Sequence, residues 1–169
     1  MSRFIKAVLL TTLIAGTLDI IAAHVHFTIN SGSFPTKMFY GIASGAVGRT
    51  AAYTGGAEMF ALGVFIHYFI SFSFSLLFFL VYPAFSKVSP NKYLNGFVYG
   101  LFVWLVMNFL VLPLTRLPQG PFVFTLNKAI GLLVLMVVFG LPISIMADRY
   151  YKRTSMSKHK TGVPQGQLV

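Results

Sequence analysis

Four long apolar runs constrain this chain more than any other feature. They cover about residues 4–29, 59–85, 93–114 and 128–147. A helix needs about 20 apolar residues to cross the hydrocarbon core of a bilayer, so each run is long enough to span one. The sequence therefore predicts an all-α integral membrane four-helix bundle over residues 1–154, with both chain termini on the same side.

The composition agrees with membrane burial rather than with a soluble domain. Hydrophobic residues make up 56% of the chain and charged residues 9%, whereas soluble domains carry about 25% charged residues. The absence of Cys excludes disulfides, thiolate metal ligands and thiol redox chemistry. The formal charge of +10 comes from basic residues at the ends of the apolar runs. This placement favours topology signals and contacts with lipid headgroups, and no pattern of a nucleic-acid-binding module is present.

The distribution of these basic residues predicts the orientation of the helices. Cytoplasmic segments of membrane proteins carry an excess of Lys and Arg. With the N-terminus inside, the inner segments hold Arg3, Lys6, Lys87, Lys92, Arg149, Lys152, Arg153, Lys158 and Lys160. The outer segments hold Lys37, Arg49, Arg116 and Lys128. We therefore expect both termini to be cytoplasmic.

The two ends of the chain allow further expectations. Arg3, Lys6 and the apolar residues after them could also form a cleaved signal peptide, but the apolar run continues past Gly16 and favours an uncleaved helix. Asp148, followed by Arg149, is interpreted as a solvated helix end. Residues 155–169 are polar and basic, which predicts a disordered cytoplasmic tail that contacts anionic lipid.

A Gly-rich segment, Lys37 to Gly56, separates the first two runs. It is too polar to span a bilayer, and residues 38–53 predict a short helix that lies at the outer interface or re-enters the membrane. The glycines of this segment are assigned to close packing or to a lid over a polar pocket; they are Gly41, Gly45, Gly48, Gly55 and Gly56. An ordinary interface helix remains the alternative to the lid.

The first run contains a stripe of small and polar residues. The stripe consists of Thr12, Gly16, Asp19, Ala23 and His26, which recur every three or four positions and so share one face of a helix. The other faces are Leu, Ile, Val and Phe. This pattern predicts that the stripe faces the bundle interior, while His24 lies off it.

The depths of the polar residues predict a common site in the outer half of the membrane. With alternating helix directions, Asp19, His26, His67 and Asn108 fall in one layer. Ionisable groups at membrane depth usually have an interior partner and a task. We interpret the layer as a ligand-binding or proton-relay site for a proton, cation or small polar solute. Arg49 is the candidate countercharge for Asp19 or for Glu58 at the outer mouth of the second helix.

Two other functions stay open on the sequence. In one, the protein is a non-catalytic accessory or structural membrane protein, and Asp19 hydrogen-bonds His67 or Asn108 to fix helix packing. In the other, it is a small metal- or lipid-dependent enzyme, with Asp19, His26 and His67 as the metal ligands. Neither catalytic motifs nor ligand spacings support the enzyme, so no catalytic residue and no cofactor are assigned. A transport path through so narrow a bundle would require a homo-oligomer.

Five segments together resemble a family of small, uncharacterised bacterial inner-membrane proteins with four helices, and more distantly the YagU-like membrane proteins. The segments are "AGTLDIIAAH", "IASGAVGRTAAYTGG", "GVFIHYFISF", "GLFVWLVMNFLVLPL" and "GLPISIMA". The resemblance implies a bacterial cytoplasmic membrane and four helices, but no catalytic role. It draws attention to Asp19, Ser44, Gly45, Gly48, Arg49, Gly55, Gly56, His67 and Asn108.

Overall fold

The computed structural model describes residues 2–31, 36–117 and 120–161; most of these residues are helical, and none of them forms a strand. Four stretches of helix are long and apolar enough to cross a membrane, which confirms the predicted fold class at this level. The first two are α1 (Arg3–Ser31) and α4 (Ala57–Val88). The short helices α2 (Thr36–Val47) and α3 (Arg49–Thr54) lie between them in the sequence.

The third and fourth long stretches each contain a π-helical turn. The third consists of α5 (Lys92–Val106), the π turn η1 (Met107–Val111) and the 3₁₀ turn η2 (Leu112–Leu114). The fourth consists of α6 (Leu126–Val134), the π turn η3 (Leu135–Gly140) and α7 (Leu141–Thr161). π turns are rare and often occur at functional sites.

The fourth helix extends well beyond its apolar run. We expected disorder from residue 155, but α7 continues to Thr161, so residues 155–161 are helical; residues 162–169 lie outside the described part of the chain. Adding residues to an existing helix costs little, since each one gains a backbone hydrogen bond. Polarity alone therefore did not end this helix.

Helix α1 crosses α4 on one side and contacts η3 and α7 on the other, while α5 packs on η3 and α7. Glycines permit the closest approach. A Cβ atom placed on Gly100 would collide with the Cα atom of Met136, and one placed on Gly140 would collide with the carbonyl oxygen of Gly96. The third and fourth long helices thus touch backbone to backbone, as small residues allow in membrane bundles.

The hydrophobic core is concentrated toward one end of the bundle, where α1 begins and α7 ends. We call this part the terminal half. Phe78, Phe79 and Ile143 are fully buried there. The hydroxyl of Tyr99 donates to the carbonyl of Phe74 at 2.6 Å. Aromatic side chains therefore fill this half, and the hydroxyls of Tyr82, Tyr99 and Tyr151 are hydrogen-bonded, whereas the buried Ser75 hydroxyl has no hydrogen-bond partner among the described residues.

Asp148 belongs to the terminal half and is not a solvated helix end. It is 6% exposed. Its Oδ1 accepts a hydrogen bond from the Tyr82 hydroxyl at 2.8 Å, and its Oδ2 pairs with Lys152 Nζ at 2.9 Å. The expectation was wrong because α7 continues past Asp148 and turns this side chain toward Tyr82 on α4.

Helices α2 and α3 lie at the opposite end of the bundle, where α2 packs on α4 and α3 packs on α2. We call this part the cavity half. The close contact comes from Gly63 of α4, where a Cβ atom would collide with the Phe39 carbonyl oxygen. The His24 ring lies 5.1 Å from the Phe39 ring, and the Arg116 backbone N–H donates to the Gly45 carbonyl at 2.9 Å. Helix α2 is thus tied to α1, to α4 and to the chain after α5.

The glycines assigned to close packing have mixed roles. Gly45 contacts the Thr115 side chain, but a Cβ atom on Gly41 would meet only the Tyr53 hydroxyl, at 3.6 Å. Gly48 has no neighbour within 4 Å of such an atom; its φ of 91° instead breaks the chain between α2 and α3, a conformation that favours glycine. Gly55 and Gly56 form the tight link into α4. Close packing therefore explains Gly45, whereas Gly48, Gly55 and Gly56 serve the breaks between helices.

Candidate functional site

A partly open cavity of about 660 Å³ lies in the cavity half. It is lined by residues of α1, α2, α4, α5, η1, α6 and η3. Its polar lining side chains are Asp19, His26, His67 and Ser71, and the rest of the lining includes Met38, Ile42, Phe74, Met107, Leu135 and Phe139. The volume is typical of ligand-binding pockets, which are mostly apolar with a few polar groups.

The predicted stripe on α1 turns inward. Thr12 and Gly16 are buried, whereas Leu13, Leu18 and Ile21 are exposed. Further along the stripe, Asp19, Ala23 and His26 line the cavity. The helical spacing of the sequence thus predicted which face of α1 carries the site.

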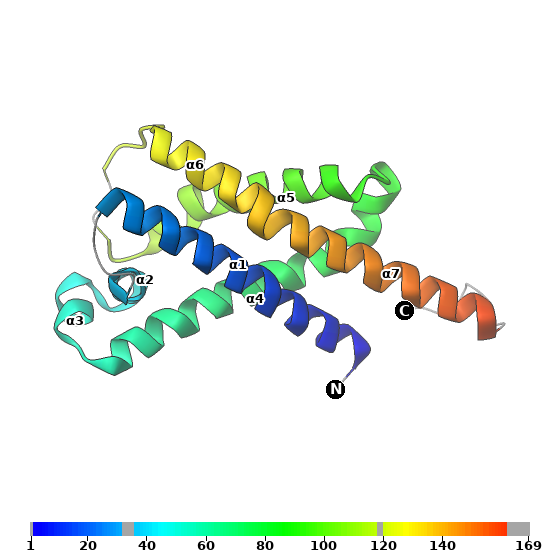
Figure 1. The fold of residues 1–169 in the computed structure, drawn as a ribbon, viewed down its shortest axis with the longest axis horizontal. Coiled ribbons are helices and arrows are strands. Elements are labelled where there is room, and N and C mark those ends of the chain that lie inside the picture. Colours follow the sequence, from blue (N-terminus) through cyan, green and yellow to red (C-terminus); the bar gives the residue numbers. More distant parts are fainter. Residues whose placement is uncertain (1, 32–35, 118–119, 162–169) are drawn as a thin grey trace.

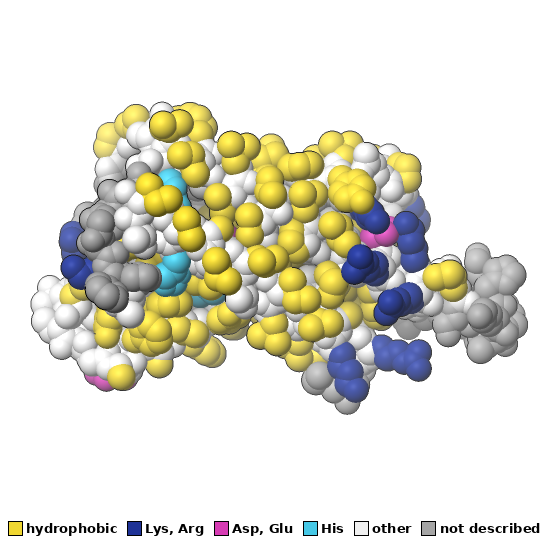
Figure 2. Space-filling model, viewed as in Figure 1, with side chains coloured by type: hydrophobic (Ala, Val, Ile, Leu, Met, Phe, Trp, Pro, Cys, Tyr) yellow, Lys and Arg dark blue, Asp and Glu magenta, His cyan; other side chains and the backbone are white. Residues whose placement is uncertain are grey.

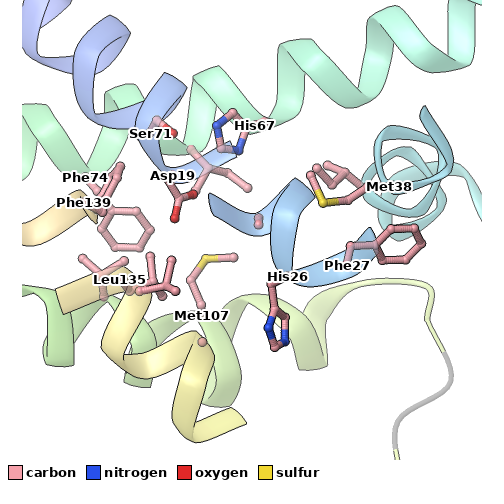
Figure 3. A pocket seen from close by; sticks show the side chains of 16 residues that line it. Asp19, His26, Phe27, Met38, His67, Ser71, Phe74, Met107, Leu135 and Phe139 are labelled. Carbon is pink, nitrogen blue, oxygen red and sulfur yellow. The ribbon is translucent and has the colours of Figure 1, made fainter. Parts of the chain in front are cut away.

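Asp19 is the central group of this cavity. Its side chain extends from α1 toward Phe139, Leu135 and Met107 (Figure 3). It makes neither a hydrogen bond nor an ion pair with any of the described residues. The expected hydrogen bonds from Asp19 to His67 or Asn108 are therefore absent from this part of the chain.

His67 reaches the same cavity from α4. Its Nε2 lies 2.9 Å from the Gly16 carbonyl oxygen on α1. A carbonyl oxygen only accepts hydrogen bonds, so Nε2 carries the proton. This bond sets the orientation of the imidazole and joins α4 to α1 one turn before Asp19.

Asn108 does not join the site, contrary to our expectation. Its Nδ2 donates to the Trp104 carbonyl of its own helix at 2.9 Å, and it does not line the cavity. The reason is the π turn η1, which inserts one extra residue into the turn and rotates the following side chains. Met107, one position earlier, lines the cavity instead.

Glu58 is also outside the site. It is exposed in the first turn of α4, and its Oε1 accepts from the Gly56 backbone N–H at 2.9 Å. A carboxylate at a helix N-terminus interacts favourably with the helix dipole. Glu58 therefore has a local explanation as a capping residue.

Arg49 is not the countercharge of either carboxylate. It is exposed and lines a second cavity of about 690 Å³, together with Lys37, Gly41 and Gly45. The one ion pair among the described residues joins Asp148 and Lys152. Gly48 breaks the helix immediately before Arg49. In the following helix α3 the buried residue is Ala52, and Arg49 faces outward.

The second cavity adjoins the first. Both are lined by Phe27, Met38, Ile42, Ile70 and Met107. Helix α2 contributes Met38 and Ile42 to this shared wall. The two spaces are thus separated by a few flexible apolar side chains, and α2 borders both.

The structure bears on the metal alternative through its donor groups. Asp19, His26 and His67 line one cavity, but the described residues contain no group of three His, Cys, Asp or Glu that could hold a metal ion. Composition alone, without converging donors, does not make a metal site.

Sequence reasoning missed the apolar walls of the cavity. Phe74, Leu135 and Phe139 belong to runs that are hydrophobic on all faces, so periodicity does not distinguish their positions from lipid-facing ones. Gly140, which ends η3, and Pro142, two residues later, are of the residue types that often accompany irregular helix geometry. They did not show which side chains that geometry brings to the site.

In comparisons with known proteins, no family model, curated protein or solved structure matches this chain. The resemblance to small four-helix inner-membrane proteins therefore stays a prediction, and the functional argument depends on the geometry of the site.

Proposed function

We propose that this protein is an integral protein of a bacterial cytoplasmic membrane, with both termini in the cytoplasm. The face that Figure 2 shows supports insertion: its middle is covered by hydrophobic side chains, and Lys and Arg gather at its two ends. Most of them lie at the end where α1 begins and α7 ends, as the excess of cytoplasmic basic residues requires.

Single-cysteine labelling tests this orientation, because the chain has no Cys of its own. Thr50→Cys, exposed on α3, should react with a membrane-impermeant maleimide in intact cells. Ser155→Cys, exposed near the end of α7, should react only after the cells are permeabilised. The reverse pattern would overturn the orientation.

Within this membrane protein, the first cavity is proposed to bind a cation with a largely apolar body. The observation that carries the proposal is Asp19, a carboxylate in an apolar cavity without a partner among the described residues. A lone charge at membrane depth is expensive. A bound cation would supply the missing countercharge, and its apolar part would contact the surrounding side chains.

The lining of the cavity favours this ligand over the other classes considered. The described lining residues include no Lys or Arg to attract an anion, and the Asp19 carboxylate would repel one. A small polar solute would leave most of its hydrogen-bonding groups unsatisfied against Phe74, Leu135 and Phe139. A proton alone would neutralise Asp19 but would not require so large a space.

The test uses tetraphenylphosphonium, a lipophilic cation, with the purified protein in detergent. We expect saturable binding that is at least about tenfold weaker in Asp19→Asn, a change that removes the charge and nearly keeps the shape. Glu58→Gln is the matched control, since it removes the same charge from an exposed carboxylate. It should bind as tightly as the wild type.

Tetraphenylborate, an anion of the same shape, completes the design. It should bind the wild type more weakly than the cation, and Asp19→Asn should bind it better. Equal binding of both ions, or equal loss in Asp19→Asn and Glu58→Gln, would overturn the proposal. If Asp19→Asn changes only thermal stability, the accessory-protein function becomes the better explanation.

A further inference from the structure

A third cavity lies at the opposite end of the bundle, between α1 and α7, and no function considered above uses it. Its volume is about 670 Å³. Its lining includes Arg3 and Leu10 of α1 and Met146, Arg149, Tyr150 and Arg153 of α7. We call it the arginine groove.

The three arginines of the groove have no acidic partner among the described residues. Asp148 is the only acid on α7, and Tyr82 and Lys152 occupy its carboxylate. Arg149 and Arg153 stand four residues apart on one face of α7, where like charges repel. The three guanidinium groups are exposed and line one cavity, so an anion from outside the protein can contact all of them there.

The groove is held in place by aromatic contacts. The rings of Phe4 and Tyr150 meet edge to face at 5.8 Å, and Tyr150 also contacts Phe79 at 5.9 Å. Since Phe4 follows Arg3 and Tyr150 follows Arg149, these contacts fix the backbone positions of two arginines. The site is therefore assembled from two helices rather than from one flexible tail.

Polarity changes along the groove in the direction of the membrane. Leu10 lies seven residues beyond Arg3, about 10 Å along α1 toward the centre of the bundle. Met146 lies three residues before Arg149 on α7, which is also toward the centre of the bundle. Charged groups therefore line the end of the groove near the chain terminus, and apolar side chains line the end nearer the centre of the bundle.

We propose that the arginine groove binds an anionic phospholipid. The guanidinium groups would hold its phosphates through paired N–H donors, and an acyl chain would lie along Leu10 and Met146. Three positive charges match a headgroup with two phosphates better than one with a single phosphate. The inference rests on the proposed membrane insertion, but it is independent of ligand binding at Asp19.

Native mass spectrometry of the detergent-purified protein tests the site, with added diphosphatidylglycerol, phosphatidylglycerol or phosphatidylcholine. We expect retention in that order, with diphosphatidylglycerol bound most tightly. The triple variant Arg3→Gln, Arg149→Gln, Arg153→Gln should bind diphosphatidylglycerol at least about tenfold more weakly. Water-soluble glycerophosphate at the same concentration should not displace the lipid, because it lacks the acyl chain.

A second triple variant is the matched control. This variant removes three positive charges as well, but from residues outside the groove: Lys6→Gln, Lys87→Gln and Lys92→Gln. Its affinity should stay within about twofold of the wild type. Arg153→Gln alone, an exposed change near the end of a helix, provides a variant that folds and should weaken binding about threefold.

If both triple variants lose the same affinity for diphosphatidylglycerol, the lipid is attracted by surface charge in general and not by the groove, and the proposal is overturned. Equal retention of phosphatidylcholine, or displacement by glycerophosphate, would do the same. Asp19→Asn should leave lipid retention unchanged. This result separates a failure of the groove from a failure of the cation site.

Discussion

Asp148 in the terminal half and Asp19 in the cavity half are both aspartates on long apolar helices, yet their surroundings differ. Asp148 is bonded to Tyr82 and paired with Lys152, and aromatic side chains fill the space around it. Asp19 has no such partner among the described residues and lines a cavity. The Asp148 carboxylate is thus paired inside a packed core, whereas the Asp19 carboxylate lies beside a cavity without a partner among the described residues.

This difference shows how a small bundle can divide its helices between stability and binding. Helix α4 takes part in both halves: it supplies Phe78, Phe79 and Tyr82 to the core, and His67 to the cavity. A site that must accept a ligand leaves contacts unmade until the ligand arrives. The terminal half then has to hold the four helices together, which makes the comparison testable by paired substitutions.

The largest expected difference follows from the packing of two isoleucines. Ile143 in the terminal half is fully buried, whereas Ile42 lines both cavities. Ile143→Ala should lower the free energy of unfolding by about 2 kcal/mol, since it leaves a void between helices that lipid cannot fill. Ile42→Ala should lower it by less than about 0.5 kcal/mol, because it only enlarges an existing space.

Denaturant titration of both variants in detergent micelles, followed by helix content, measures these free energies. The same substitution is made on a helix in each half, so the change in intrinsic helix propensity is matched and the difference reports burial and packing. Equal effects at the two positions would mean that the halves do not differ in packing, and the proposed division of roles would fail.

The sequence predicted the four long helices because their apolar runs have the length that a bilayer requires. It placed Asp19 and His26 on one face because the α-helical period holds throughout α1. It misplaced Asn108 because no local sequence pattern predicts the π turn η1. This turn belongs to the third long helix, which packs closely on the fourth through Gly96, Gly100 and Gly140. Regular helices can thus be read from spacing, whereas departures from regularity depend on tertiary contacts.

The same limit explains two charged residues, Asp148 and Arg49, whose surroundings were predicted wrongly. Asp148 seemed solvated because it follows the last apolar residues, but its partner Tyr82 lies 66 positions away in the sequence. Arg49 seemed a countercharge because a segment that folds back could bring it to Asp19 or Glu58, yet Gly48 breaks the helix before it and Arg49 is exposed. Pairing between distant residues is a property of the packed bundle, not of any one segment.

A smaller effect separates the two aspartates directly. Asp148→Ala should lower the free energy of unfolding by about 1 kcal/mol, because it leaves the Tyr82 hydroxyl without its acceptor and Lys152 without its partner. Asp19→Ala should leave it unchanged or raise it slightly, since no bond within the described residues is lost and a lone carboxylate is removed from an apolar cavity. The same micelle titration measures both.

Tyr82→Phe serves as the control for Asp148, because it removes the same hydrogen bond from the other side and should give a similar loss. If Asp19→Ala proves as destabilising as Asp148→Ala, then Asp19 stabilises the helix packing. Its carboxylate would then have a structural role and would not be explained by a ligand.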